Sequence, residues 1–155
     1  MVASRTYFQP EGMDFAYGSL LGMMVLCYVP HTIKAILYKA ITKRTPNNAD
    51  PRNALNVADP VLQTEKAAIL RRAQSCHYNL LENFAFFAAG VIAAKVAHVP
   101  TATINYYVAM HVLFRVAYVP LYLLISTNPA SALRSIAFFG AAYASAMLMI
   151  SAAYA

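Results

Sequence analysis

The feature that most restricts the fold of this chain is a series of four long apolar stretches. They cover about residues 15–37, 61–97, 102–125 and 130–154, and each reaches the roughly 20 residues that a membrane-spanning helix needs. The apolar runs are unbroken rather than alternating, which argues against a membrane β-barrel. Charged residues make up only 12% of the chain, where a soluble domain has about a quarter. We therefore expect an all-α integral membrane protein, with residues 1–155 forming one domain built as a four-helix bundle.

The segment 39–60 separates the first two helices and is rich in residues that break helices. It contains Pro46, Pro51 and Pro60 together with several asparagines, so we expect a long loop without internal helix. The second helix should begin near Val61, with Pro60 in its first turn and Asp59 as its N-cap. At 1.5 Å per residue it would be about 50 Å long, so its start should project beyond the bilayer core.

Basic residues are concentrated in one part of the chain. Eight of the twelve Lys and Arg residues lie between Lys34 and Arg72, and the net charge is +6. They flank apolar segments and form no stripe with interleaved aromatic residues, so we expect no nucleic-acid partner. Because basic loops stay on the cytosolic side, the loop before the second helix should face the cytosol. Both termini should then lie on the opposite side, and the turn near Asn128 should return to the cytosolic side.

The two cysteines, Cys27 and Cys76, both lie in apolar surroundings. They form no CxxC motif, and the chain has no His, Cys, Asp or Glu cluster with metal-ligand spacing, so we expect no metal site. Free cysteine is among the most buried residue types. Both residues are therefore predicted to be buried thiols.

Two polar stripes interrupt the apolar helices. Arg72, Ser75, Asn79 and Glu82 fall within an arc of about 80° on the second helix. Such a stripe should face the protein interior or a water-filled cleft, because polar groups in the membrane are costly. A purely structural network between helices is the alternative. His77 points away from the stripe, and we expect a hydrogen-bonded interface residue there rather than a base.

The third helix carries the second stripe, which consists of Tyr107, His111, Arg115, Tyr118 and Tyr122. Glu82 and Arg115 should lie at similar depth and pair, within one subunit or between subunits. Arg72, Asn79, Tyr122 and Arg134 should converge on the cytosolic half. Arginine and tyrosine donors in a membrane favour a small anionic, polar ligand with an apolar partner.

The stretch from Arg72 through Asn79-Leu80-Leu81-Glu82-Asn83 resembles the second-helix signature of the MAPEG family. These are the membrane-associated proteins in eicosanoid and glutathione metabolism, among them the microsomal glutathione S-transferases. The run Arg115-Val116-Ala117-Tyr118 with Tyr122, and the pair Arg134-Ser135, resemble the motifs of the third and fourth helices. The resemblance covers nearly the whole chain. Ser75 stands where many members have a second Arg, and Phe138 where many have a Tyr.

This resemblance implies a homotrimer that binds glutathione, as co-substrate, between subunits near the cytosolic side. The implied glutathione-binding residues are Arg72, Asn79, Glu82, Arg115, Tyr118 and Tyr122, and Arg134 would be the catalytic residue that stabilises the thiolate. The implied function is a transferase or peroxidase that acts on lipophilic electrophiles or lipid hydroperoxides in the endoplasmic reticulum or mitochondrial membrane. The alternative is a non-catalytic protein of this type, either lipid-binding or an accessory subunit of a larger membrane complex.

Overall fold

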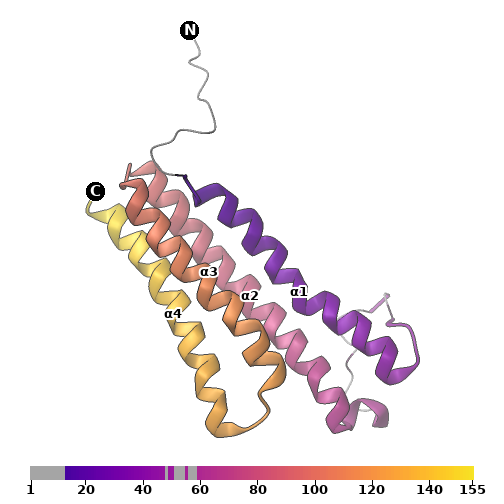
Figure 1. The fold of residues 1–155 in the computed structure, drawn as a ribbon. Coiled ribbons are helices and arrows are strands. Elements are labelled where there is room, and N and C mark those ends of the chain that lie inside the picture. The colour runs from indigo at the N-terminus through magenta and orange to yellow at the C-terminus, as the bar shows by residue number, and fades with distance from the viewer. Residues whose placement is uncertain (1–12, 48, 51–54, 56–58) are drawn as a thin grey trace.

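The computed structural model describes residues 13–47, 49–50, 55 and 59–155. Its α-helices are α1 (Ala16–Thr42), α2 (Glu65–Val96), α3 (Thr101–Leu124) and α4 (Asn128–Ala153), and a short 3-10 helix, η1 (Pro60–Gln63), precedes α2. All four α-helices are long and apolar enough to cross a membrane. They lie side by side in an elongated bundle, with the start of α1 and the end of α4 at the same end (Figure 1). The predicted all-α membrane architecture is confirmed.

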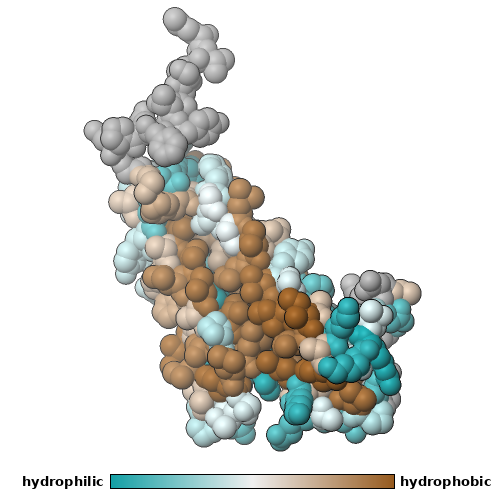
Figure 2. Space-filling view, turned by 45° about the vertical axis from the view of Figure 1, so that its right-hand side comes forward, coloured by the Kyte–Doolittle hydropathy of each residue, from teal (hydrophilic) through white to brown (hydrophobic). Residues whose placement is uncertain are grey.

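The helices α2 and α3 hold the bundle together, because each of them packs against all three of the other α-helices. The pairs α1–α2 and α3–α4 also run along each other as antiparallel neighbours. A broad hydrophobic band crosses the middle of the surface, and hydrophilic residues gather toward the ends (Figure 2). This distribution suits a bundle whose middle lies in the lipid hydrocarbon and whose ends lie in the headgroups.

The first helix is longer than the sequence predicted. It continues to Thr42 instead of ending near residue 37, because no proline or glycine occurs between residue 37 and Pro46. It ends at Lys43, which adopts a left-handed backbone (φ 57°) and donates its N–H to the carbonyl of Lys39 at 3.0 Å. The expectation that segment 39–60 holds no helix was therefore wrong for its first residues. Positions 48, 51–54 and 56–58 of that loop lie outside the described residues.

The start of the second helix also differs from the prediction. Asp59 and Pro60 do begin a helical turn, and the Asp59 side chain accepts a hydrogen bond from the N–H of Val61 at 3.0 Å. That turn is η1, however, and α2 begins only at Glu65. Thr64 has an extended backbone that separates the two, and its hydroxyl accepts from the N–H of Ala67 at 3.3 Å. Thr64, and not Asp59, is therefore the N-cap of α2.

Candidate functional site

A cavity of about 340 Å³ lies where the end of α3 meets the start of α4. The two helices form an antiparallel hairpin, because only a short turn separates Leu124 from Asn128. Residues spaced three or four apart on each helix share the face toward the cavity. The lining residues are Tyr118, Tyr122, Ser131, Arg134, Ser135, Phe138 and Phe139.

Three of these lining residues, Tyr118, Tyr122 and Arg134, were predicted as site residues. Ser131 and Phe139 were not singled out from the sequence. The available signal was their helical spacing from Arg134 and Ser135, which places Ser131 one turn before them and Phe139 one turn after. The site was predicted from charged and phenolic residues alone, so the other residues on the same face of α4 were missed.

Arg134 is the cationic group of the cavity. Its guanidinium carbon lies 4.9 Å from the ring centroid of Tyr122, a distance that allows a cation–π interaction. The side chain is half-buried, and no ion pair with a carboxylate neutralises it among the described residues. A guanidinium with free N–H donors at a cavity wall can bind a carboxylate or stabilise a thiolate.

Tyr118 contributes a phenol that a second helix holds in place. The side-chain amide of Asn79, on α2, donates a hydrogen bond to the Tyr118 hydroxyl oxygen at 2.9 Å. Because that oxygen accepts from Asn79, the hydroxyl proton of Tyr118 stays available for a ligand. The ring of Tyr122 lies 5.2 Å from that of Tyr118, centroid to centroid, so the two phenols form one wall.

Arg72 lies at the same end of the bundle, and its guanidinium bonds to a backbone carbonyl group rather than lining the cavity. Its Nε donates to the carbonyl oxygen of Leu123 at 3.0 Å. Leu123 is in the last turn of α3, where carbonyl groups have no partner within the helix. Arg72 therefore joins α2 to the end of α3, next to the Tyr122 wall of the cavity.

Arg115 does not line the cavity, because its side chain is fully buried behind the rings that do. Its guanidinium carbon lies 5.3 Å from the Tyr118 ring centroid and 4.9 Å from that of Phe138. None of its three side-chain nitrogens has a hydrogen-bond partner among the described residues.

The predicted pair between Glu82 and Arg115 does not form within the chain. Glu82 is exposed on the outer surface of α2, whereas the exposed fraction of Arg115 is 0%. Similar depth in the membrane is not sufficient for two residues to pair. Arg115 points into the bundle, whereas Glu82 points outward from it. The alternative, a pair between Glu82 of one subunit and Arg115 of another, stays a prediction.

His77 on α2 and His111 on α3 both make structural contacts. His77 lies within 2.7 Å of the carbonyl oxygen of Cys27 through its Nδ1, which confirms the prediction of a hydrogen-bonded interface residue. His111 stacks on Phe87 with centroids 3.9 Å apart, and its Nδ1 lies 2.9 Å from the hydroxyl of Ser145. In the described part of the chain, no group of His, Cys, Asp or Glu side chains could hold a metal ion.

The comparisons with known proteins agree with this architecture. The model of the MAPEG family matches residues 15–154, from the start of α1 to the end of α4. Neither the curated proteins nor the solved structures gave a significant match. The family match covers nearly all of the sequence and includes every element that forms the cavity. The chain belongs to the MAPEG family, a family of membrane proteins of glutathione and eicosanoid metabolism.

Proposed function

We propose that this protein is a glutathione-dependent transferase or peroxidase that acts on lipophilic electrophiles or lipid hydroperoxides. One observation supports the proposal most directly: Arg134 stands at a cavity beside two phenols, and it has no carboxylate partner in the part of the chain that the structure describes. Glutathione has carboxylates and a thiol, and its thiolate is the reactive form. A free thiol has a pKa of about 8.5, and a neighbouring guanidinium lowers it toward neutrality. Arg134 would therefore be the catalytic residue.

The phenols and the Asn79 amide would bind and orient the tripeptide. The Asn79 amide donates to the Tyr118 hydroxyl oxygen, so Tyr118 can donate its own hydroxyl proton into the cavity. Tyr122 would keep Arg134 in position through the ring contact. Arg72 would stabilise this end of α3, and Arg115 would act through its charge from behind the aromatic wall.

Glu82 supports an assembly of several subunits. It is exposed on α2, in the middle of a helix long and apolar enough to span a membrane. A carboxylate that faces lipid is costly, and a neighbouring subunit that covers it would remove that cost. We propose that the protein is a homotrimer and that Glu82 contributes to glutathione binding across the subunit contact.

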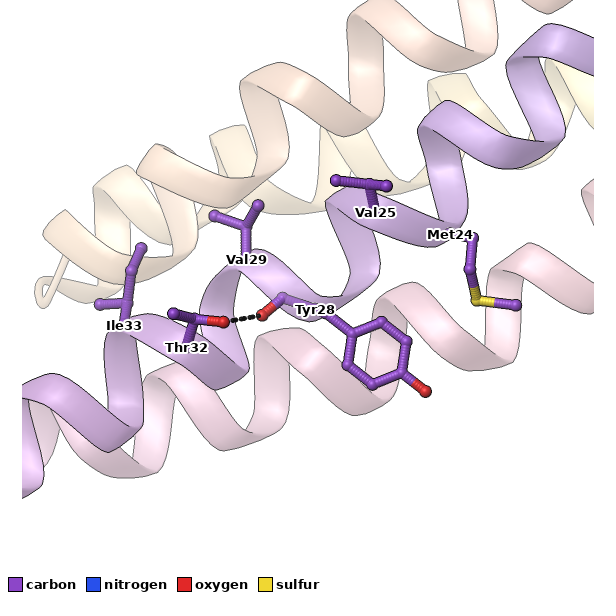
Figure 3. A pocket seen from close by; sticks show the side chains of 6 residues that line it. All are labelled: Met24, Val25, Tyr28, Val29, Thr32 and Ile33. Carbon is purple, nitrogen blue, oxygen red and sulfur yellow. Dashed lines mark hydrogen bonds between the residues drawn. The ribbon is translucent and has the colours of Figure 1, made fainter.

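The lipophilic partner would approach from the membrane. An apolar groove of about 430 Å³ runs along the outer face of α1, lined by Met24, Val25, Tyr28, Val29, Thr32 and Ile33 (Figure 3). Thr32 turns its hydroxyl back to the carbonyl oxygen of Tyr28 at 3.1 Å, so the groove presents mainly hydrocarbon. Such a surface suits a lipophilic electrophile or the acyl chain of a lipid hydroperoxide.

The test compares wild type with Arg134→Ala in turnover of glutathione with a small aromatic electrophile. Removal of one electrostatic donor to the developing thiolate should lower turnover by about 10²-fold. Arg134→Lys should keep part of the activity, and Arg44→Ala, at an exposed ion pair with Asp59, should keep all of it. Wild-type activity equal to background, together with no bound glutathione, would reject the enzyme and favour the accessory or lipid-binding protein.

A further inference from the structure

The outer face of α1 changes along its length from apolar to basic. The groove of about 430 Å³ on this face is lined by six residues between Met24 and Ile33, and none of them is charged (Figure 3). Lys39 follows Thr32 of the groove by about two helical turns, so the two lie on the same face of α1. Lys43 lies next to Lys39, because its backbone N–H donates to the Lys39 carbonyl oxygen at 3.0 Å. The groove therefore leads toward two lysines at the end of the helix.

The length of α1 places the groove in one leaflet and the lysines at the headgroups of that leaflet. The helix has 27 residues, so it is about 40 Å long, against a hydrocarbon core of about 30 Å. The charged Asp14 stands just before α1, and Lys39 lies about 35 Å along the axis from Ala16, just beyond the far edge of the core. From Met24 to Ile33 the groove covers about 14 Å, close to half of that core. This is the depth that the acyl chains of one leaflet occupy.

The positive charge at this end of α1 is not neutralised by the chain. Lys39 and Lys43 are both exposed, and neither has an ion-pair partner among the described residues. Arg44, by contrast, pairs with Asp59 at 3.1 Å. Figure 2 shows hydrophilic residues gathered beside the hydrophobic band, at the end of the molecule that holds the end of α1. Because basic side chains at this depth attract anionic headgroups, the lysine pair complements a negatively charged lipid better than a zwitterionic one, which brings its own cation.

We propose that the outer face of α1 binds one anionic phospholipid, with an acyl chain in the groove and the headgroup phosphate at Lys39 and Lys43. The hydroxyl of Thr32 donates to the carbonyl oxygen of Tyr28, so the groove presents hydrocarbon to the chain. The binding needs no glutathione and goes beyond the proposed enzyme activity. A lipophilic substrate would displace this lipid in order to enter the groove.

The test is native mass spectrometry of the full-length protein in a mild detergent, with phosphatidylglycerol or phosphatidylcholine of the same acyl chains. Each basic residue near a membrane surface contributes about fivefold, so phosphatidylglycerol should bind up to about 25-fold more tightly than phosphatidylcholine. Lys39→Gln should weaken the binding of phosphatidylglycerol by about fivefold. Lys66→Gln removes the same charge from an exposed position on α2 and should leave the binding unchanged. Glycerol phosphate, which has the anionic group without acyl chains, should not bind.

A second pair of variants tests the groove. Val25 lines it and Leu21, one turn earlier, does not, and both side chains are more than half exposed, so each position accepts a larger residue. Val25→Trp should weaken the binding of both lipids several-fold, and Leu21→Trp should leave it unchanged. Three results would each overturn the proposal: equal binding of the two lipids, an equal loss in Lys39→Gln and Lys66→Gln, or full binding in Val25→Trp. Glycerol phosphate that binds as tightly as phosphatidylglycerol would overturn it too, because the acyl chain would then contribute nothing.

Discussion

Replacement of Gly140 by alanine tests how tightly α3 and α4 pack, because its effect on packing opposes its effect on helix propensity. An added Cβ at Gly140 would lie 2.6 Å from Cε2 and Cζ of Phe114 and 2.8 Å from its Cδ2. Real Cβ atoms do not approach this closely, so the Phe114 ring or the helix must move. Overpacking of this kind costs about 1–3 kcal/mol. Alanine is also the better helix former by about 0.5–1 kcal/mol, which opposes the loss.

The control is Gly18→Ala, because a Cβ there meets nothing within 4 Å. Both variants gain the same helix propensity, so the difference between them isolates the clash. We expect Gly140→Ala to be less stable than Gly18→Ala by about 1–3 kcal/mol, measured by unfolding in detergent. Because Gly140 follows the cavity residue Phe139, glutathione turnover should fall as well. Equal stability of the two variants would show that Phe114 is free to turn away and that α3 and α4 are not tightly packed here.

Three further predictions concern the rest of the bundle. Arg115→Met should leave stability in detergent unchanged or higher, because the buried charge has no hydrogen-bond or ion-pair partner among the described residues, whereas a loss of about 3–5 kcal/mol would reveal one. The Lys95 ammonium lies 2.5 Å from the Asp14 carboxylate and lowers the pKa of that carboxyl. The ion pair therefore stabilises the start of α1 at neutral pH, and this stabilisation is lost as the pH falls below the usual carboxyl range. The protection of the amides at the start of α1 against hydrogen exchange, relative to the intrinsic exchange rate at each pH, should then fall on acidification in wild type but not in Asp14→Asn. Lys43 and Arg44 should be cut by protease added outside sealed vesicles that expose the cytosolic side, and cleavage only after rupture would reverse the orientation.

The sequence was sufficient to predict the four spanning helices because hydrophobic length is a strong signal in a membrane. The start of α2 was misplaced because two good capping sites, Asp59 and Thr64, follow each other closely. Propensity cannot choose between them. In the structure Leu62 of η1 is buried against the end of α1 together with Ala67 and Leu70 of α2, and the extended backbone of Thr64 separates η1 from α2.

The candidate site could be predicted from the sequence only in part. Tyr118 and Tyr122 were recognisable because they share one face of the third helix with Arg115, and the resemblance to the MAPEG motifs added Asn79 and Arg134. Glu82 and Arg115 were paired by depth alone, and depth says nothing about which side of a helix its neighbours cover. Only the packing of α2 against α3 and α4 shows that Arg115 is enclosed and Glu82 is exposed.

The most direct test of the proposed chemistry is a glutathione titration of the purified protein, followed by the ultraviolet absorbance of the thiolate. If Arg134 stabilises the thiolate, wild type should show an absorbance that rises with glutathione and saturates at neutral pH. Arg134→Ala should bind glutathione but show much less of this absorbance, because Asn79 and Tyr118 remain while the cation is gone. No thiolate absorbance in wild type at saturating glutathione would contradict the proposed activation. Equal absorbance in both proteins would contradict the role of Arg134.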